Sequence, residues 1–138
     1  MTILGFNFRD IKVNRKEGIK GKINIKNNVV ITDIKEHDLS LGEKSQKALK
    51  FLFEFSSKYE PDFGEIVLGG DLVFIESASK IKEVLDGWKK SKKISKDIMA
   101  GVLNTVLVKC NIEALILSQK VSLPPPIPLP EVKQEEAK

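Results

Sequence analysis

The chain has 138 residues, of which 41% are hydrophobic and 30% are charged, and its formal net charge is +4. This length and apolar content are typical of one folded domain and exclude a wholly disordered chain. With one His and one Cys, the chain has too few ligands for a zinc site and cannot form an internal disulfide, which fits a reducing cytoplasm.

The basic excess is built almost entirely from lysine. Arg9 and Arg15 are the only arginines among the 23 basic residues. Arginine is the side chain that reads phosphates and base edges, whereas lysine is a strongly hydrated point charge. The composition therefore favours a solvated surface over a nucleic-acid reader, and binding of RNA or DNA through lysines is kept as the alternative function.

We expect neither a signal peptide nor a membrane span. The residues after Met1 read as a strand rather than as a basic region followed by an apolar core. The longest apolar stretch, 98–117, is interrupted by Asn104, Lys109 and Glu113, so it is too polar for membrane insertion. Together with the single cysteine, these features predict a cytoplasmic protein.

The first predicted strand changes face partway along its length. Phe6 and Phe8 share one parity, and Ile11 and Val13 share the other. Because side chains alternate strictly along a strand, such a switch predicts a β-bulge near Arg9–Asp10.

Three more strands are predicted before residue 76. The second covers 23–31, although Asn27–Asn28 leaves a short hairpin as an alternative. The third, over 49–55, alternates cleanly between apolar and charged residues, and a Pro-Asp-Phe-Gly turn follows it. The fourth covers 66–75, with a bend or bulge expected at Gly69–Gly70. Short connections make an antiparallel meander the simplest arrangement.

At Ser77 the apolar period changes from two to 3.6 residues, which predicts a capped helix with Trp88 on its apolar stripe. A lysine run then leads to a longer helix over 95–120, with Ser95 as its cap. Beyond one stripe from Ile98 to Cys110, this helix is apolar nearly all round, which indicates cover on two sides. With one sheet available, we expect a second copy of the chain to provide the other cover. The predicted oligomer interface comprises Val108, Ile112 and Ile116.

Five prolines within 124–130 force an extended path after the long helix. The predicted fold is therefore α+β: an antiparallel sheet of about four long strands, covered on one face by one short and one long helix. One domain is expected over 1–130, followed by a charged, disordered tail over 131–138.

Nothing in the sequence assembles a catalytic site. Gly42-Glu-Lys-Ser45 lacks the adjacent Gly-Lys pair of a phosphate-binding loop. His37 lies between Glu36 and Asp38, but consecutive strand residues point to opposite faces and do not converge on a metal. Cys110 falls on the apolar stripe and reads as a core residue. We therefore expect no enzyme, no metal and no cofactor.

The segment Ser122-Leu-Pro-Pro-Pro-Ile-Pro-Leu-Pro-Glu-Val132, directly after the long helix, resembles the Phe-Pro-Pro-Leu-Asn-Leu-Ala-Pro-Val segment of the SecB export-chaperone family. Phe6-Asn-Phe8-Arg-Asp-Ile-Lys-Val13 is similar in style to that family's first strand. The likeness of layout, with four long strands, a crossover, an interface helix and a proline-rich stretch, spans about 3–132. Unlike the family, this chain is basic, and no counterpart of the family's final helix or zinc-binding tail is visible.

The resemblance implies a homotetramer, built as a dimer of dimers, whose apolar grooves hold unfolded or pre-export polypeptides without ATP. It implies groove residues Phe6, Phe8, Leu123, Ile127 and Leu129, to which the residue pattern adds Phe63 and Trp88. The first hypothesis is thus a cytoplasmic SecB-like holdase acting as a homodimer or homotetramer. A lysine-rich nucleic-acid-associated protein and a purely structural oligomer subunit are the second and third.

Overall fold

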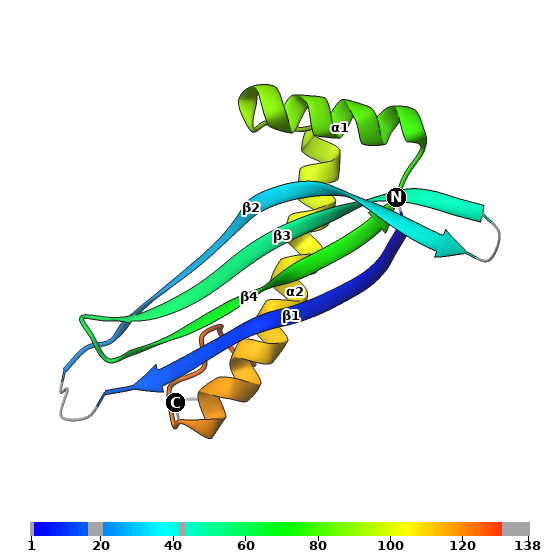
Figure 1. Cartoon of the computed structure of the whole chain (residues 1–138). Helices are drawn as coiled ribbons and strands as arrows, with labels where there is room; N and C mark the ends of the chain where they lie inside the picture. Colours follow the sequence, from blue (N-terminus) through cyan, green and yellow to red (C-terminus); the bar gives the residue numbers. More distant parts are fainter. Residues whose placement is uncertain (1, 17–20, 42–43, 131–138) are drawn as a thin grey trace, which may run out of the picture.

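The computed structural model describes residues 2–16, 21–41 and 44–130 (Figure 1). Its elements are β1 (Thr2–Arg15), β2 (Asn24–Leu41), β3 (Lys44–Glu60), β4 (Gly64–Ile75), α1 (Ala78–Ser91) and α2 (Lys96–Lys120). The predicted α+β class, with four long antiparallel strands and a short and a long helix, is confirmed. The predicted tail, 131–138, lies outside the described residues.

The four strands form one open antiparallel sheet in the order β1-β4-β3-β2 (Figure 1). The expected meander holds for β2, β3 and β4 but is wrong for β1, which lies beside β4 at the opposite edge from β2. Thr2 pairs with Ile75 and Arg15 with Gly64, so β1 and β4 pair along their whole length. Local alternation shows that a segment is a strand, but it does not identify the partner, which tertiary pairing decides.

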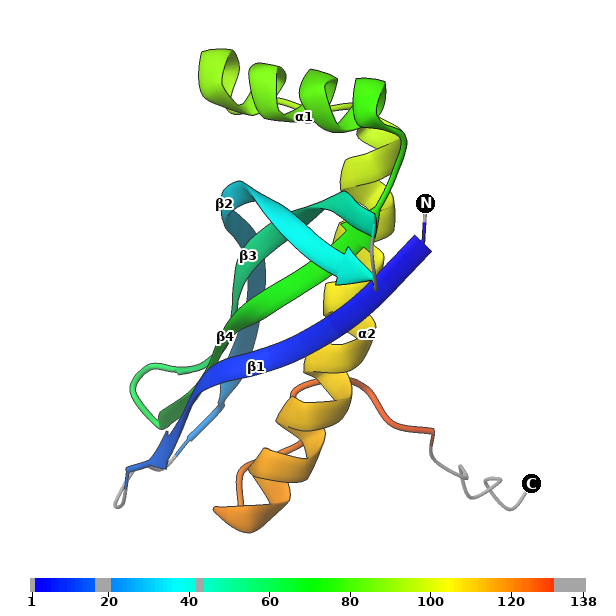
Figure 2. The ribbon, with the colours of Figure 1, turned by 45° about the vertical axis from the view of Figure 1, so that its right-hand side comes forward.

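One face of the sheet carries the core. α2 runs along this face and α1 lies across one end of it (Figures 1 and 2), and buried side chains of both helices belong to the same core cluster. Phe51 and Phe74 point into this core, whereas their neighbours Leu52 and Val73 point to the opposite face, as alternation predicts. The buried inner-face residues of β3 and β4 are Leu49, Phe51, Phe53, Phe55, Ser57, Tyr59, Ile66, Leu68, Leu72 and Phe74.

The bulge predicted near Arg9–Asp10 is confirmed. Phe8 pairs with Gly70 and Asp10 with Gly69, so Arg9 is the extra residue. The irregularity expected at Gly69–Gly70 therefore occurs beside these glycines, but it belongs to β1 rather than to β4. The side chain of Arg9 forms an ion pair with the buried carboxylate of Asp71.

The alternative of a hairpin at Asn27–Asn28 is wrong, because β2 runs through both residues. Asn27 pairs with Ser57 and Asn28 with Ser56 of β3. The sequence did not indicate two further register shifts, one between Ile3 and Gly5 of β1 and one, a bulge, between Ile31 and Asp33 of β2.

The predicted helix starts lie close to those observed. The backbone N–H of Lys80 donates to the Ser77 hydroxyl oxygen at 3.4 Å, as expected of a capping serine. Ser95 occupies the same position before α2, but its side chain makes no capping hydrogen bond.

Candidate functional site

α1 ends in a tight turn that brings the chain back beneath the helix before α2 begins. Lys92 has a left-handed backbone (φ 57°), and its N–H donates to the carbonyl of Trp88 at 3.0 Å. The returning segment passes close to Gly87, where a Cβ atom would lie 2.8 Å from the carbonyl oxygen of Lys93. The absence of a side chain at Gly87 therefore permits the close junction of the two helices.

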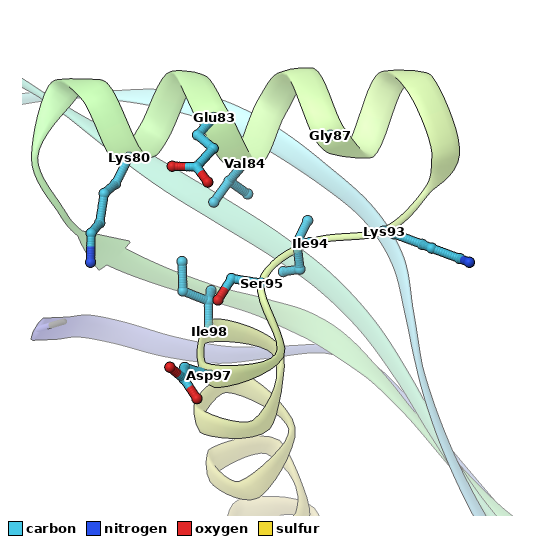
Figure 3. A pocket seen from close by; sticks show the side chains of 9 residues that line it. All are labelled: Lys80, Glu83, Val84, Gly87, Lys93, Ile94, Ser95, Asp97 and Ile98. Atoms are coloured by element: carbon cyan, nitrogen blue, oxygen red, sulfur yellow. The ribbon is translucent and has the colours of Figure 1, made fainter.

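A cavity of about 410 Å³ lies at this junction. Figure 3 shows the side chains of Val84 and Glu83 pointing from α1 toward Ile94 and Ser95, while the side chain of Lys93 points away. The cavity thus combines an apolar centre with charged groups at its edge. Its lining residues are Lys80, Glu83, Val84, Gly87, Lys93, Ile94, Ser95, Asp97 and Ile98.

A second hollow of about 540 Å³ shares part of the same turn and extends along the first turns of α2. Its surface is mainly apolar, and three lysines stand at its edge. Sequence reasoning missed it, because the apolar side chains at the start of α2 were predicted to face the sheet. This hollow, called the basic trough, is lined by Lys92, Lys93, Ile94, Lys96, Met99, Ala100 and Leu103.

The outer face of α2, directed away from the sheet, carries the predicted interface residues together. Val108, Ile112 and Ile116 are 58%, 56% and 45% exposed. Their spacing of four places them along one ridge of the helix, and the preceding residue of that ridge is the uncharged Asn104. The described chain therefore presents an uncharged, largely apolar ridge to its surroundings.

By length and composition alone, α2 is long and apolar enough to cross a membrane. However, Val102, Val106 and Cys110 of this helix are completely buried in the core shared with the sheet. A core helix of a water-soluble protein has the same length and composition. The apolar character of α2 is therefore weak evidence for a membrane span.

Two of the predicted polypeptide-binding residues are core residues in the single chain. Trp88 is 8% exposed and Leu123 is 5% exposed. The indole N–H of Trp88 donates to Asp33 Oδ1 at 3.2 Å, which ties α1 to the bulge of β2. Lys92 Nζ lies over the Trp88 ring, 4.9 Å from its centre, which is within the range of a cation–π interaction.

The predicted binding residues Phe6 and Phe8 lie side by side and half-buried against the core. Phe6 stacks on Phe53 with a centroid distance of 5.0 Å, and it meets Phe8 edge-on at 5.1 Å. The rings fill space over Gly70, which pairs with both Phe8 and Phe53. Phe63, in the turn before β4, is also half-buried against the core.

The proline-rich segment is fastened to the far end of the sheet. The hydroxyl of Tyr59 donates to the carbonyl oxygen of Pro124 at 2.5 Å. The side-chain amide of Asn27 donates to the carbonyl oxygen of Pro126 at 2.8 Å. The hydroxyl of Ser57 donates in turn to Asn27 Oδ1 at 2.6 Å. We call Asn27, Ser57 and Tyr59 the proline clasp, and residues 121–130 the arm.

The sequence contains one signal that indicates the clasp. Ser57 stands on the buried parity of β3 among aromatic residues, where a small polar side chain needs a hydrogen-bond partner. Of the predicted binding residues on the arm, Ile127 is half-buried and Leu129 is 43% exposed. The structure thus leaves the end of the arm open, while its beginning is held.

No catalytic constellation is found in the described part of the chain. Cys110 is buried, and burial raises the pKa of its thiol to about 12, which keeps it protonated. His37 is half-buried on β2. Within the described ranges, no group of three His, Cys, Asp or Glu side chains has the arrangement to hold a metal ion.

Comparison with known proteins gives no relative: no family model, curated protein or solved structure matches the chain.

Proposed function

We propose that this protein is an ATP-independent holdase, a non-catalytic chaperone that binds apolar segments of unfolded polypeptides as a homo-oligomer. The observation that carries the proposal is the apolar surface that a single chain leaves outside its core. This surface lies in the basic trough and on the outer face of α2. The resemblance of the arm to the proline-rich segment of the SecB family supports the same function.

The two surfaces have different parts in this proposal. The outer face of α2 joins copies of the chain, because covering Val108, Ile112 and Ile116 is favourable by about 1.5–3 kcal/mol for each fully buried side chain. The basic trough receives the client, because its apolar surface is concave and borders a turn rather than forming a ridge. Several weak sites on one oligomer then provide avidity without sequence specificity.

The charge around the trough predicts which clients bind best. Lys92, Lys93 and Lys96 attract acidic residues that flank an apolar segment, and charge complementarity raises the association rate. On the arm, Ile127 and Leu129 add apolar surface for a longer client. Trp88 and Leu123, in contrast, bind clients only if the core opens, so they do not belong to the proposed site.

The test is suppression of aggregation in the absence of ATP. Reduced α-lactalbumin and reduced lysozyme serve as an acidic and a basic client, and light scattering is followed with a several-fold excess of the protein. The proposal expects less scattering for both clients and the larger effect for the acidic one. Unchanged scattering of both clients would end the holdase proposal.

A matched pair of variants tests the location of the site. Ala100 is exposed and lines the trough, and Ala78 is exposed at the start of α1, away from it. Ala100→Glu places a charge in the apolar surface and should abolish most of the protection, whereas Ala78→Glu should leave it intact. Equal activity of the two variants would move the site elsewhere.

The same exposed lysines favour the second candidate, a nucleic-acid-associated protein. Binding of labelled RNA or DNA through lysine contacts to phosphates would fall steeply as salt rises. Fluorescence anisotropy over a range of salt concentrations separates this candidate from the holdase. Absence of nucleic-acid binding at low salt would rule out this second candidate.

A further inference from the structure

The clasp holds the arm in the way that a receptor holds a peptide. Its two donors, the Tyr59 hydroxyl and the Asn27 amide, reach carbonyls two residues apart, those of Pro124 and Pro126. Two carbonyls of the arm are thus bound by side chains, not by the backbone pairing of strand addition. Aromatic residues and side-chain donors are the usual means by which proteins bind polyproline-like segments.

The clasp is built into the rigid part of the sheet. Ser57 and Tyr59 are 0% and 1% exposed on the inner face of β3. Asn27 lies opposite Ser57 in the register between β2 and β3. The bond from the Ser57 hydroxyl to Asn27 Oδ1 fixes the side-chain amide so that its NH₂ group faces the carbonyl of Pro126. The Asn27 donor is therefore oriented by the sheet and not only by the arm.

Proline suits this site for a chemical reason. A proline residue offers a carbonyl but no backbone N–H. The clasp offers hydrogen-bond donors to the arm, because the acceptor of the Asn27 side chain, Oδ1, is already bonded to the Ser57 hydroxyl. Any other residue at 124 or 126 would bring an N–H group into a part-buried place, where an unpaired donor costs about 1–3 kcal/mol. The site therefore selects segments in which prolines carry the bound carbonyls.

The arm is held mainly through its first residues, as a tethered ligand would be. Besides the two carbonyl bonds, Leu123 and Pro126 are the buried residues of the arm. Leu123 packs beside Gly64, where its Cδ2 would lie 3.3 Å from an added Cβ. Beyond Ile127 the arm is exposed. A second proline-rich segment therefore has to displace the two carbonyl bonds and the buried contacts of Leu123 and Pro126 in order to occupy the clasp.

We propose that the clasp of Asn27, Ser57 and Tyr59 is a recognition site for proline-rich peptide segments, and that the arm is its resident, tethered ligand. This proposal does not depend on the holdase function. A segment of another polypeptide and the arm of a second copy have the same chemistry, so either source fits the site.

The test uses the full chain with a weakened arm. A tethered ligand competes at an effective concentration on the order of millimolar, so a free peptide binds poorly to the unaltered chain. Leu123→Ala combined with Pro126→Ala loosens the arm and leaves the clasp intact. The probe is a decapeptide with the sequence of residues 121–130. Tyr59 is the only tyrosine, so fluorotyrosine labelling provides a single fluorine NMR signal at the site.

The peptide should bind the loosened chain at least about tenfold more tightly than the unaltered chain, with a shift of the Tyr59 signal. Added Asn27→Ala should remove this binding, whereas added Asn28→Ala, on the other face of the same strand, should preserve it. A peptide with alanine at the positions of Pro124 and Pro126 should bind at least about fivefold less tightly, because its N–H groups stay unpaired.

Either of two results would overturn the proposal: no peptide binding by any variant at millimolar concentration, or binding that Asn27→Ala and Asn28→Ala change equally. If Leu123→Ala unfolds the chain, as judged by circular dichroism, Pro126→Ala alone provides the loosened arm. Light scattering distinguishes the two sources. Exchange of arms between copies doubles the mass and is reversed by excess peptide, whereas capture of a separate segment leaves the number of chains unchanged.

Discussion

The indole of Trp88 and the carboxylate of Asp33, 55 positions apart in the chain, meet in a hydrogen bond of 3.2 Å. Asp33 Oδ1 also accepts from the backbone N–H of Ile34 at 2.8 Å. The Ile34 N–H first, and then the Trp88 indole, lower the pKa of Asp33 below its usual value. One carboxylate thus fastens α1 to the bulge of β2 and orders the bulge itself.

This arrangement makes stability depend on pH. Because the pKa of Asp33 is lower in the folded than in the unfolded chain, its contribution is present above the unfolded value of about 3.9 and is lost as pH falls through the folded value. Asp33→Asn should reduce the free energy of unfolding near neutral pH by on the order of 1 kcal/mol, and the difference should shrink in acid. Urea unfolding at both pH values measures this. The exposed Asp38→Asn is the control, and a difference that persists in acid would contradict the assignment.

Gly70 is required because two neighbours occupy the place of its missing side chain. A Cβ atom there would lie 2.0 Å from the carbonyl oxygen of Asn7 and 2.9 Å from Cζ of Phe53. Gly70→Ala should therefore destabilise the fold by about 1–3 kcal/mol, as other overpacked cores do. At Gly69 the nearest atom, Asp10 Oδ2, lies at 3.6 Å, so Gly69→Ala is the matched control. Chemical denaturation compares the two, and equal losses would show that glycine is not needed for space.

Cys110 should report opening of the core. Burial raises the pKa of its thiol to about 12, whereas a free thiol has a pKa near 8.5. Since the thiolate is the reactive form, alkylation by iodoacetamide at about pH 8 should be on the order of a thousandfold slower in the folded chain than in denaturant. Mass spectrometry follows the modification. Rapid labelling of the folded protein would mean that α2 separates readily from the sheet.

The outer face of α2 should control the oligomeric state. Val108→Asp places a charge within the proposed contact between copies, where an unpaired buried charge is strongly unfavourable. It should convert the oligomer into a monomer in light scattering at micromolar concentration. Asn24→Asp adds the same charge at an exposed site on β2 and should leave the mass unchanged. If the unaltered chain is a monomer, there is no contact between copies. If Val108→Asp leaves the mass unchanged, the contact lies elsewhere.

Much of the fold could be predicted because strands and helices impose their own periods on the chain. The change of parity between Phe8 and Ile11 predicted the bulge, and the change of period at Ser77 predicted the first helix. The position of β1 could not be predicted, because pairing between distant strands depends on how whole faces fit together. The hairpin considered at Asn27–Asn28 failed for a similar reason, since Ser56 and Ser57 on the partner strand continue the pairing.

The candidate sites were harder to predict than the elements that carry them. The family resemblance implied that Leu123 binds polypeptides, and the residue pattern suggested the same for Trp88, yet each is covered by a distant part of the chain. The basic trough depends on where the turn at Lys92 directs the start of α2, and the clasp depends on the return of the arm to β3. Both are contacts between elements, and a local pattern does not specify them.

The sequence by itself determined that 41% of the residues are hydrophobic, that they form four strands and two helices, and that one helix is apolar nearly all round. It also determined that the chain carries one His and one Cys. Only the tertiary structure decided which apolar residues are hidden, since burial depends on what lies opposite a side chain and not on the side chain alone. It hides Trp88 and Leu123, half-buries Phe6 and Phe8, and leaves Val108, Ile112 and Ile116 exposed.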